Sequence, residues 1–208
     1  MSPSHHPGDE LLLALAAGSL APTAALVVGV HADACPACRA HAARLEAVGG
    51  ALLDGLPPST MTADALERAL DRLGAPEPAS RTPRPQGLDL SEVLAELPLG
   101  RRRWLGPGVW MRPIGRDRAG TAYLLRTGPR ARLIEHGHAG SEYVLVLKGG
   151  FSDVTGRYGV GDFAAADARL THQPVTDPGE ECLCLVFSEA PMRMRGLLGR
   201  VLQPLIGL

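Results

Sequence analysis

The sequence predicts a two-domain α + β protein, with a small helical bundle at the N-terminus and an all-β barrel at the C-terminus. Apolar side chains recur at helical spacing over residues 7–73. Residues 76–87 combine several prolines with small and polar side chains, which is the composition of an extended linker. Short apolar or alternating runs broken by glycine follow, as in a β-sandwich or barrel. We therefore place a helical domain at 1–75, a linker at 76–87 and a barrel domain at 88–208, and expect each domain to have its own core.

The helical domain is expected to contain four short helices. Pro22 suits a first helical turn, Thr62 suits an N-cap, and Gly74 suits the end of a helix. Helices this short need a metal or a partner to fix their packing. The expected ranges are Asp9–Ala17, Pro22–His31, Pro36–Leu53 and Ala63–Leu73.

The barrel domain is expected to contain several short strands separated by turns. A short helix at Asp89–Leu97 would precede them, and the amphipathic tail Arg195–Leu208 would pack back on the barrel. The clearest strand patterns are Val109–Arg112, Ala122–Thr127, Glu142–Leu147, Tyr158–Ala165 and Glu181–Phe187.

Charge and hydropathy exclude two classes of partner. The formal net charge is −1 and the isoelectric point is about 6.7, so there is no electrostatic footprint for direct nucleic-acid binding. No apolar run approaches the roughly 20 residues of a membrane span, so no membrane contact is expected. The N-terminus lacks a basic segment, and Leu11–Ala17 is too short for a signal sequence, so we expect a cytoplasmic protein.

A first candidate metal site is the pattern His-x3-Cys-x2-Cys formed by His31, Cys35 and Cys38. At this spacing the three side chains fall on one side of a helix. Pro36 disfavours a continuous helix, so we expect a break near Cys35 with the ligands still converging. Tetrahedral zinc needs a fourth ligand, which His6 or its neighbour His5 would supply. The metal would then join the first helix to the third.

Three other interpretations of this pattern remain open. Cys35 and Cys38 could be small core residues, with His31 as a helix-capping residue. A redox dithiol is a second alternative, although the βαβ context of that motif is absent. His41 is a third, as a competing ligand.

A second candidate metal site is the pattern His-x-His-x3-Glu, formed by His136, His138 and Glu142, with His172 further along the chain. Positions two apart on a strand share a face, so both histidines can project into a barrel. Three imidazoles and a carboxylate suit a divalent transition metal. Zinc is the first expectation, with iron, manganese or nickel as alternatives. Surface histidines on a loop are the competing interpretation.

Cys182 and Cys184 lie two apart on a predicted strand and therefore share a face. In a reducing compartment they are not expected to form a structural disulfide. They could be small buried hydrophobes, redox sensors near the metal, or additional metal ligands.

The N-terminal part resembles the zinc-binding anti-sigma domain. The resemblance rests on HHPGDELLLALAAGSL and VGVHADACPACRAHAARLEAVGGALL, within residues 5–55. In that domain an N-terminal histidine and the His-x3-Cys-x2-Cys pattern hold zinc, which implies His6, His31, Cys35 and Cys38 as ligands here. The domain's role implies a protein partner, an extracytoplasmic-function (ECF) sigma factor that is kept off RNA polymerase.

The C-terminal part resembles the cupin family. HGHAGSEYVLVLKGGF is similar to the first cupin motif, and His172 takes the place of the second-motif histidine. The usual Pro-x-Gly before that histidine is missing, and Ala166–Thr171 stands there instead. The whole chain is similar to the ChrR-type anti-sigma factors, which join these two modules in this order. That resemblance implies release of the sigma factor on oxidative stress of the singlet-oxygen type, sensed through the cupin domain.

Two functions compete on these patterns. A metal-dependent cupin enzyme, dioxygenase-like and with a helical accessory domain, would need an open coordination position. Four protein ligands fill the tetrahedral shell of zinc, which disfavours catalysis. The attached anti-sigma domain therefore favours a regulator that is not an enzyme.

Overall fold

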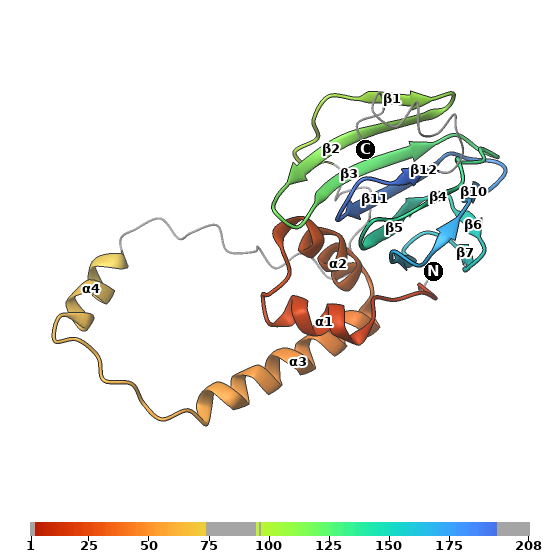
Figure 1. The fold of residues 1–208 in the computed structure, drawn as a ribbon. Helices are drawn as coiled ribbons and strands as arrows, with labels where there is room; N and C mark the ends of the chain where they lie inside the picture. The colour runs from red at the N-terminus through yellow and green to blue at the C-terminus, as the bar shows by residue number, and fades with distance from the viewer. Residues whose placement is uncertain (1–2, 74–94, 96, 195–208) are drawn as a thin grey trace.

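The computed structural model describes residues 3–73, 95 and 97–194 (Figure 1). Helices occupy the N-terminal part and antiparallel strands the C-terminal part, which confirms the predicted fold class. The linker 76–87 and the tail Arg195–Leu208 lie outside the described residues, as does nearly all of the helix expected at Asp89–Leu97. The helices are α1 (Asp9–Ala16), α2 (Pro22–Ala34), α3 (Pro36–Asp54) and α4 (Ala65–Arg72).

The chain breaks between α2 and α3 at a single residue, as predicted. Cys35 is extended, with φ −96° and ψ 112°, and Pro36 starts α3. Proline fits there because the first turn of a helix does not need its missing N–H. The break lets Cys35 and Cys38 face the same side as His31.

The C-terminal part is built from three antiparallel sheets. The largest has the order β1-β2-β3-β11-β5-β8, and two smaller sheets have the orders β10-β6-β7 and β12-β4-β9. The smaller sheets lie beside the β5 end of the large one, as Figure 1 shows. The strands are β1 (Arg103–Gly106), β2 (Val109–Arg116), β3 (Thr121–Thr127), β4 (His136–Gly137), β5 (Glu142–Lys148), β6 (Phe151–Asp153), β7 (Gly156–Tyr158), β8 (Phe163–Ala166), β9 (Thr171–His172), β10 (Val175–Thr176), β11 (Cys182–Ser188) and β12 (Arg193–Met194).

The single strand predicted at Tyr158–Ala165 is in fact two strands. β7 ends at Tyr158 and β8 begins at Phe163, with a turn between them. Gly161 in this turn has φ +88°, a conformation that L side chains rarely adopt. Gly161 and Asp162, directly before Phe163, mark this turn in the sequence.

The helical part and the barrel share one core, which differs from the two separate cores expected from the linker. α2 packs against β3, β5 and β11 as well as against α1 and α3. Val27, Val28 and Val30 of α2 are fully buried, in one cluster with Leu145 and Leu185 of the sheet. A helix that is apolar on all sides must be covered on all sides. The sheet covers the sides of α2 that α1 and α3 do not cover.

Of the helices in the described residues, α1, α2 and α3 pack together and α4 stands apart from them. α4 has no buried residue, and Figure 1 shows it well apart from the barrel, beyond the C-terminal half of α3. Large apolar side chains are exposed along both segments. They are Val48, Leu52, Leu53, Leu56, Met61, Leu66, Leu70 and Leu73, which we call the α3–α4 apolar stripe.

Candidate metal centres

The structure brings the four N-terminal candidates together. One ligand atom from each of His6, His31, Cys35 and Cys38 lies within 4.8 Å of the others. The Sγ of Cys38 lies 3.3 Å from Nε2 of His31 and 3.4 Å from Nδ1 of His6. The Sγ of Cys35 lies 3.5 Å from the same His6 nitrogen. Two sulfurs and two imidazole nitrogens around a common point suit tetrahedral zinc.

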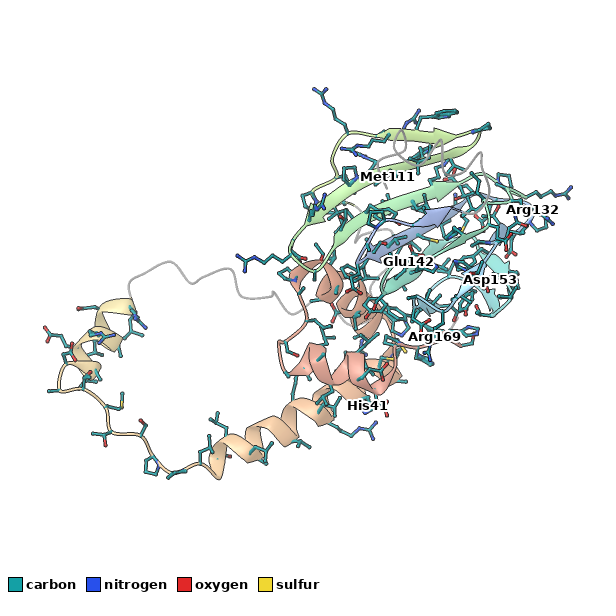
Figure 2. All side chains as sticks on the ribbon, in the orientation of Figure 1. His41, Met111, Arg132, Glu142, Asp153 and Arg169 are labelled. Carbon is teal, nitrogen blue, oxygen red and sulfur yellow. The ribbon has the colours of Figure 1, made fainter. Side chains whose placement is uncertain are left out.

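The two alternative histidines lie elsewhere. His5 turns toward the barrel, where its ring contacts Tyr158 at 4.5 Å between centroids. His41 lies on the helical part (Figure 2), with Nδ1 3.7 Å from a carboxylate oxygen of Asp9. The geometry therefore favours His6 over both as the fourth member of this cluster.

His31 is oriented by the barrel. Its Nδ1 lies 2.9 Å from the carbonyl oxygen of Gly161, which can only accept, so Nδ1 carries the proton. Nε2 is then an unprotonated lone pair directed at the two sulfurs. Burial lowers the pKa of His31 to about 4, which keeps the ring neutral at neutral pH. A neutral imidazole with its second nitrogen held by a carbonyl is the form in which histidine binds metals.

The cysteines need a cation to ionise. Burial, together with the neighbouring Cys35, raises the pKa of Cys38 to about 12. The free thiol would stay protonated at neutral pH, whereas a bound metal displaces that proton. Metal binding at this cluster is therefore coupled to proton release.

The second set of candidates also converges, from three strands of the barrel. His136 and His172 pair across β4 and β9, His138 follows β4, and Glu142 begins β5. The Nε2 atom of His172 lies 3.1 Å from Nε2 of His136 and 3.1 Å from Nε2 of His138. Nδ1 of His138 lies 3.8 Å from a Glu142 oxygen, and all four residues are buried.

Hydrogen bonds fix two of these rings in a metal-binding form. Nδ1 of His136 donates to the carbonyl oxygen of Ile134 at 2.8 Å, and Nδ1 of His172 donates to Asp153 at 2.6 Å. Both Nε2 atoms then carry lone pairs, and these lone pairs face each other at 3.1 Å. Such a contact is repulsive unless a cation lies between the nitrogens. The barrel cluster therefore fits a bound metal ion.

Burial sets the charge of this cluster. It lowers the pKa of His136 and lowers that of His138 to about 4, so both rings are neutral at neutral pH. It also raises the pKa of Glu142 to about 7. Neutral imidazoles with one carboxylate suit a divalent transition metal, and this donor set does not by itself select zinc over iron, manganese or nickel.

Asp153 is a functional residue that the sequence analysis missed. It lies on β6, within the barrel (Figure 2), and its carboxylate accepts hydrogen bonds from Thr155 as well as from His172. Burial acts to raise the pKa of Asp153, but these hydrogen bonds outweigh burial and lower it. Asp153 is therefore an anion that orients His172.

Little space adjoins the barrel cluster. A cavity of about 20 Å³ is lined by residues that include Glu142, Asp153 and His172. A volume of that size holds about one water molecule, whereas small-molecule sites typically measure about 300 to 1,000 Å³. This cavity could therefore hold a water molecule beside Glu142, Asp153 and His172, and it is much smaller than a typical small-molecule site.

Cys182 and Cys184 are buried neighbours inside the barrel. Their sulfurs are 3.6 Å apart, and they pack in an apolar cluster with Met111 and Val186. The hydrogen bond with Cys182 and burial raise the pKa of Cys184 well above the ordinary range. A protonated, buried thiol reacts slowly with oxidants. The arrangement favours the interpretation as core residues over that as redox sensors.

No helix within the described ranges is long and apolar enough to cross a membrane.

The chain is similar to known proteins over both its helical part and its barrel part. The ChrR cupin-like domain family matches residues 101–191. Anti-sigma-E factor ChrR of Cereibacter sphaeroides is 37% identical over 209 residues, covering 98% of each chain. The crystal structure of Rhodobacter sphaeroides SigE in complex with the anti-sigma ChrR is similar with a TM-score of 0.76 and 36% identity, over 90% of this chain and 99% of that one.

Proposed function

The chain belongs to the family of ChrR anti-sigma factors, and on this premise we propose that it binds an ECF sigma factor and keeps it from RNA polymerase. Members of this family are regulators and not enzymes, and the small cavity beside the barrel cluster is in keeping with that role. Because its partner would be a subunit of RNA polymerase, we place its action in the cytoplasm.

The observation that carries this proposal is the α3–α4 apolar stripe. Leu66, Leu70 and Leu73 follow one face of α4, and all three are exposed. A helix of 8 residues without buried contacts is only marginally stable in water. An unpartnered apolar face of this kind marks a protein interface. The sigma factor would cover the stripe and order α4.

Substitutions in the stripe test the proposal. Leu66→Asp and Leu70→Asp should each weaken binding of the purified ECF sigma factor at least tenfold, measured by calorimetry. Val154→Asp is the matched control, because Val154 is also exposed, at 77%, but lies on the barrel. Wild-type affinity in both leucine variants would refute this interface.

We further propose zinc at the N-terminal cluster, held by His6, His31, Cys35 and Cys38. There the metal would join the segment before α1 to the α2–α3 break, and so fix the helices that present the stripe. For the barrel cluster, His136, His138, Glu142 and His172, we propose zinc as the first choice, with iron, manganese or nickel as alternatives. Metal analysis of the purified full chain and of its His31→Ala and His172→Ala variants would assign each ion to its site.

The barrel is proposed to sense the signal for release. In this proposal oxidative stress of the singlet-oxygen type changes the barrel cluster, and the change favours a form of the chain with lower affinity for the sigma factor. Such a switch requires a coupling free energy of about 1 to 3 kcal/mol between the two sites. Support comes from the family and from the packing of α2 on the sheet that carries Glu142.

The sensing proposal has a direct cellular test. Strains carrying His136→Ala, His172→Ala or a truncation after Gln86 should still repress a sigma-dependent reporter but should not respond to photosensitiser and light. A normal light response in the truncated strain would remove the sensing role from the barrel.

A further inference from the structure

We infer that the turn between β7 and β8, residues 159–163, is a structural part of the N-terminal metal site, with Asp162 as the positioning residue. The inference rests on the proposed zinc binding at that site. The turn contributes no ligand of its own. Instead it holds two of the four ligands, His6 and His31, in place from the barrel side.

Asp162 holds the segment that carries His6, here called the arm, Pro3–His6. Its carboxylate oxygen Oδ1 accepts the backbone N–H of Ser4 at 2.6 Å and that of His5 at 3.0 Å. The Ser4 hydroxyl donates to the same carboxylate at 3.2 Å. The chain is anchored from the other side as well, because the N–H of Phe163 donates to the carbonyl oxygen of His5 at 3.1 Å.

The carboxylate of Asp162 is suited to this role. Only 6% of the residue is exposed, and its second oxygen accepts the N–H of Gly159 at 2.8 Å. Burial acts to raise the pKa of Asp162, but the backbone hydrogen bonds from Gly159, Ser4 and His5 outweigh burial and lower it to about 2. The group is an anion surrounded by donors, so the arm and the turn form one hydrogen-bonded unit.

Gly161 contacts the site from the same turn. Its carbonyl oxygen accepts the Nδ1 proton of His31 and so directs Nε2 at the cluster. A Cβ at this position would lie 3.0 Å from the Cγ of Pro3, which shows how closely the arm covers the turn. Residues 159–163 therefore contact His31 directly and hold the arm that carries His6 through Ser4 and His5.

This arrangement should raise metal affinity by preorganisation. Without the turn, His6 would sit on a free N-terminal segment, and its backbone would have to be ordered on metal binding at about 1 to 2 kcal/mol per residue. Changes to groups that orient metal ligands typically cost 10 to 100-fold in affinity. We therefore expect Asp162→Asn, in the full chain, to weaken metal binding at the N-terminal site about tenfold or more.

Cobalt titration of the metal-free full chain tests whether Asp162→Asn weakens metal binding at the N-terminal site. A thiolate bound to Co²⁺ gives a strong near-ultraviolet charge-transfer band that histidine and carboxylate ligands do not give. The band therefore reports on Cys35 and Cys38 and not on the barrel cluster. The expected result for Asp162→Asn is a right-shifted titration of this band relative to wild type.

A second variant tests the contact from the arm side. Ser4→Pro removes the backbone N–H and the hydroxyl that Ser4 donates to Asp162, and it changes no residue of the barrel. If Asp162 acts through the arm, Ser4→Pro and Asp162→Asn combined should lose less affinity than the sum of the single losses. Additive losses would overturn this route of action.

Two control variants distinguish a specific role of Asp162 from a general loss of stability. Asp117 anchors the other end of α2 through Thr23, and Asp167 is an exposed carboxylate on the barrel. Asp117→Ala and Asp167→Asn should both titrate like wild type. An unchanged band in Asp162→Asn, or an equal loss in Asp117→Ala, would overturn the inference. A wild-type chain without the charge-transfer band would overturn the proposed metal site and the inference together.

Discussion

Thr23, in the first turn of α2, donates both its backbone N–H and its hydroxyl to the same carboxylate oxygen of Asp117, each at 2.9 Å. Asp117 lies in the turn between β2 and β3, so a side chain of the barrel caps a helix of the N-terminal part. α2 is thus held by the barrel at its start, through Asp117, and near its end, through the contact of His31 with Gly161.

Removing this cap should destabilise the whole chain. We expect Asp117→Ala to lower the free energy of unfolding by about 1 kcal/mol, measured by urea denaturation, since losing a helix cap costs about 0.5 to 2 kcal/mol. Asp117→Asn should cost less, because asparagine caps nearly as well. Equal stability of the alanine variant and wild type would contradict the assigned role.

The contribution of Asp117 should depend on pH in a defined direction. Hydrogen bonds from Thr23 lower the pKa of Asp117 in the folded state. The stabilisation is therefore fully present above the unfolded pKa, about 4, and is lost as pH falls through the lower folded pKa. The difference in stability between wild type and Asp117→Ala should be constant from pH 5 to 7 and should shrink below pH 4.

Loss of either cysteine ligand should remove zinc and partner binding together. Cys35→Ala and Cys38→Ala each take a ligand from the cluster that joins the segment before α1 to α2 and α3. Metal analysis and a pull-down with the ECF sigma factor are the measurements. A zinc-free variant that holds the sigma factor with normal affinity would show that the metal is not needed for the inhibitory fold.

Asp153→Ala should weaken metal binding at the barrel cluster selectively. The substitution leaves Nδ1 of His172 without its acceptor at 2.6 Å, so the tautomer and ring orientation are no longer fixed. We expect an affinity loss of about 10 to 100-fold, measured by chelator competition. The thiolate–cobalt band of the N-terminal site is the internal control, and its loss in this variant would indicate a general folding defect instead.

A fragment of residues 1–85 should still inhibit the sigma factor, because it retains the N-terminal cluster and the α3–α4 apolar stripe. It should also be less stable than the full chain, because the part of α2 that packs on β3, β5 and β11 becomes exposed. Each fully buried aliphatic side chain contributes about 1.5 to 3 kcal/mol. Thermal unfolding of the zinc-loaded fragment and full chain would show this, and identical midpoints would contradict a shared core.

The sequence analysis identified ligands that lie close together in the chain. It missed the residues that contact those ligands from distant parts of the sequence. His31, Cys35 and Cys38 could be identified because their spacing places them around one helix break, and His136, His138 and Glu142 because they are close in the chain. His6 was one of two candidates for the fourth zinc ligand, beside His5, and His172 joined the second set as a distant imidazole; the family resemblance implied both residues as ligands.

Asp153, Gly161 and Asp162 could not be identified in the same way. They act on histidines that are distant in sequence, and aspartate and glycine are ordinary residues in turns. Strands of two or three residues, such as β4 and β9, are too short to show the alternation of apolar and polar residues that identifies a strand. The apolar composition of α2 on all its faces was the available sign of a shared core, because such a helix needs cover on every side.

The α3–α4 apolar stripe has a consequence for how such a chain is produced. Leu73, for example, is 81% exposed in the chain alone, and in the proposed complex the sigma factor would cover it. Molecules made in excess of the partner would present this surface to chaperones and proteases, or to one another. Synthesis of the two proteins in matched amounts would keep this surface covered. The cellular half-life of this chain should therefore rise with the amount of its partner.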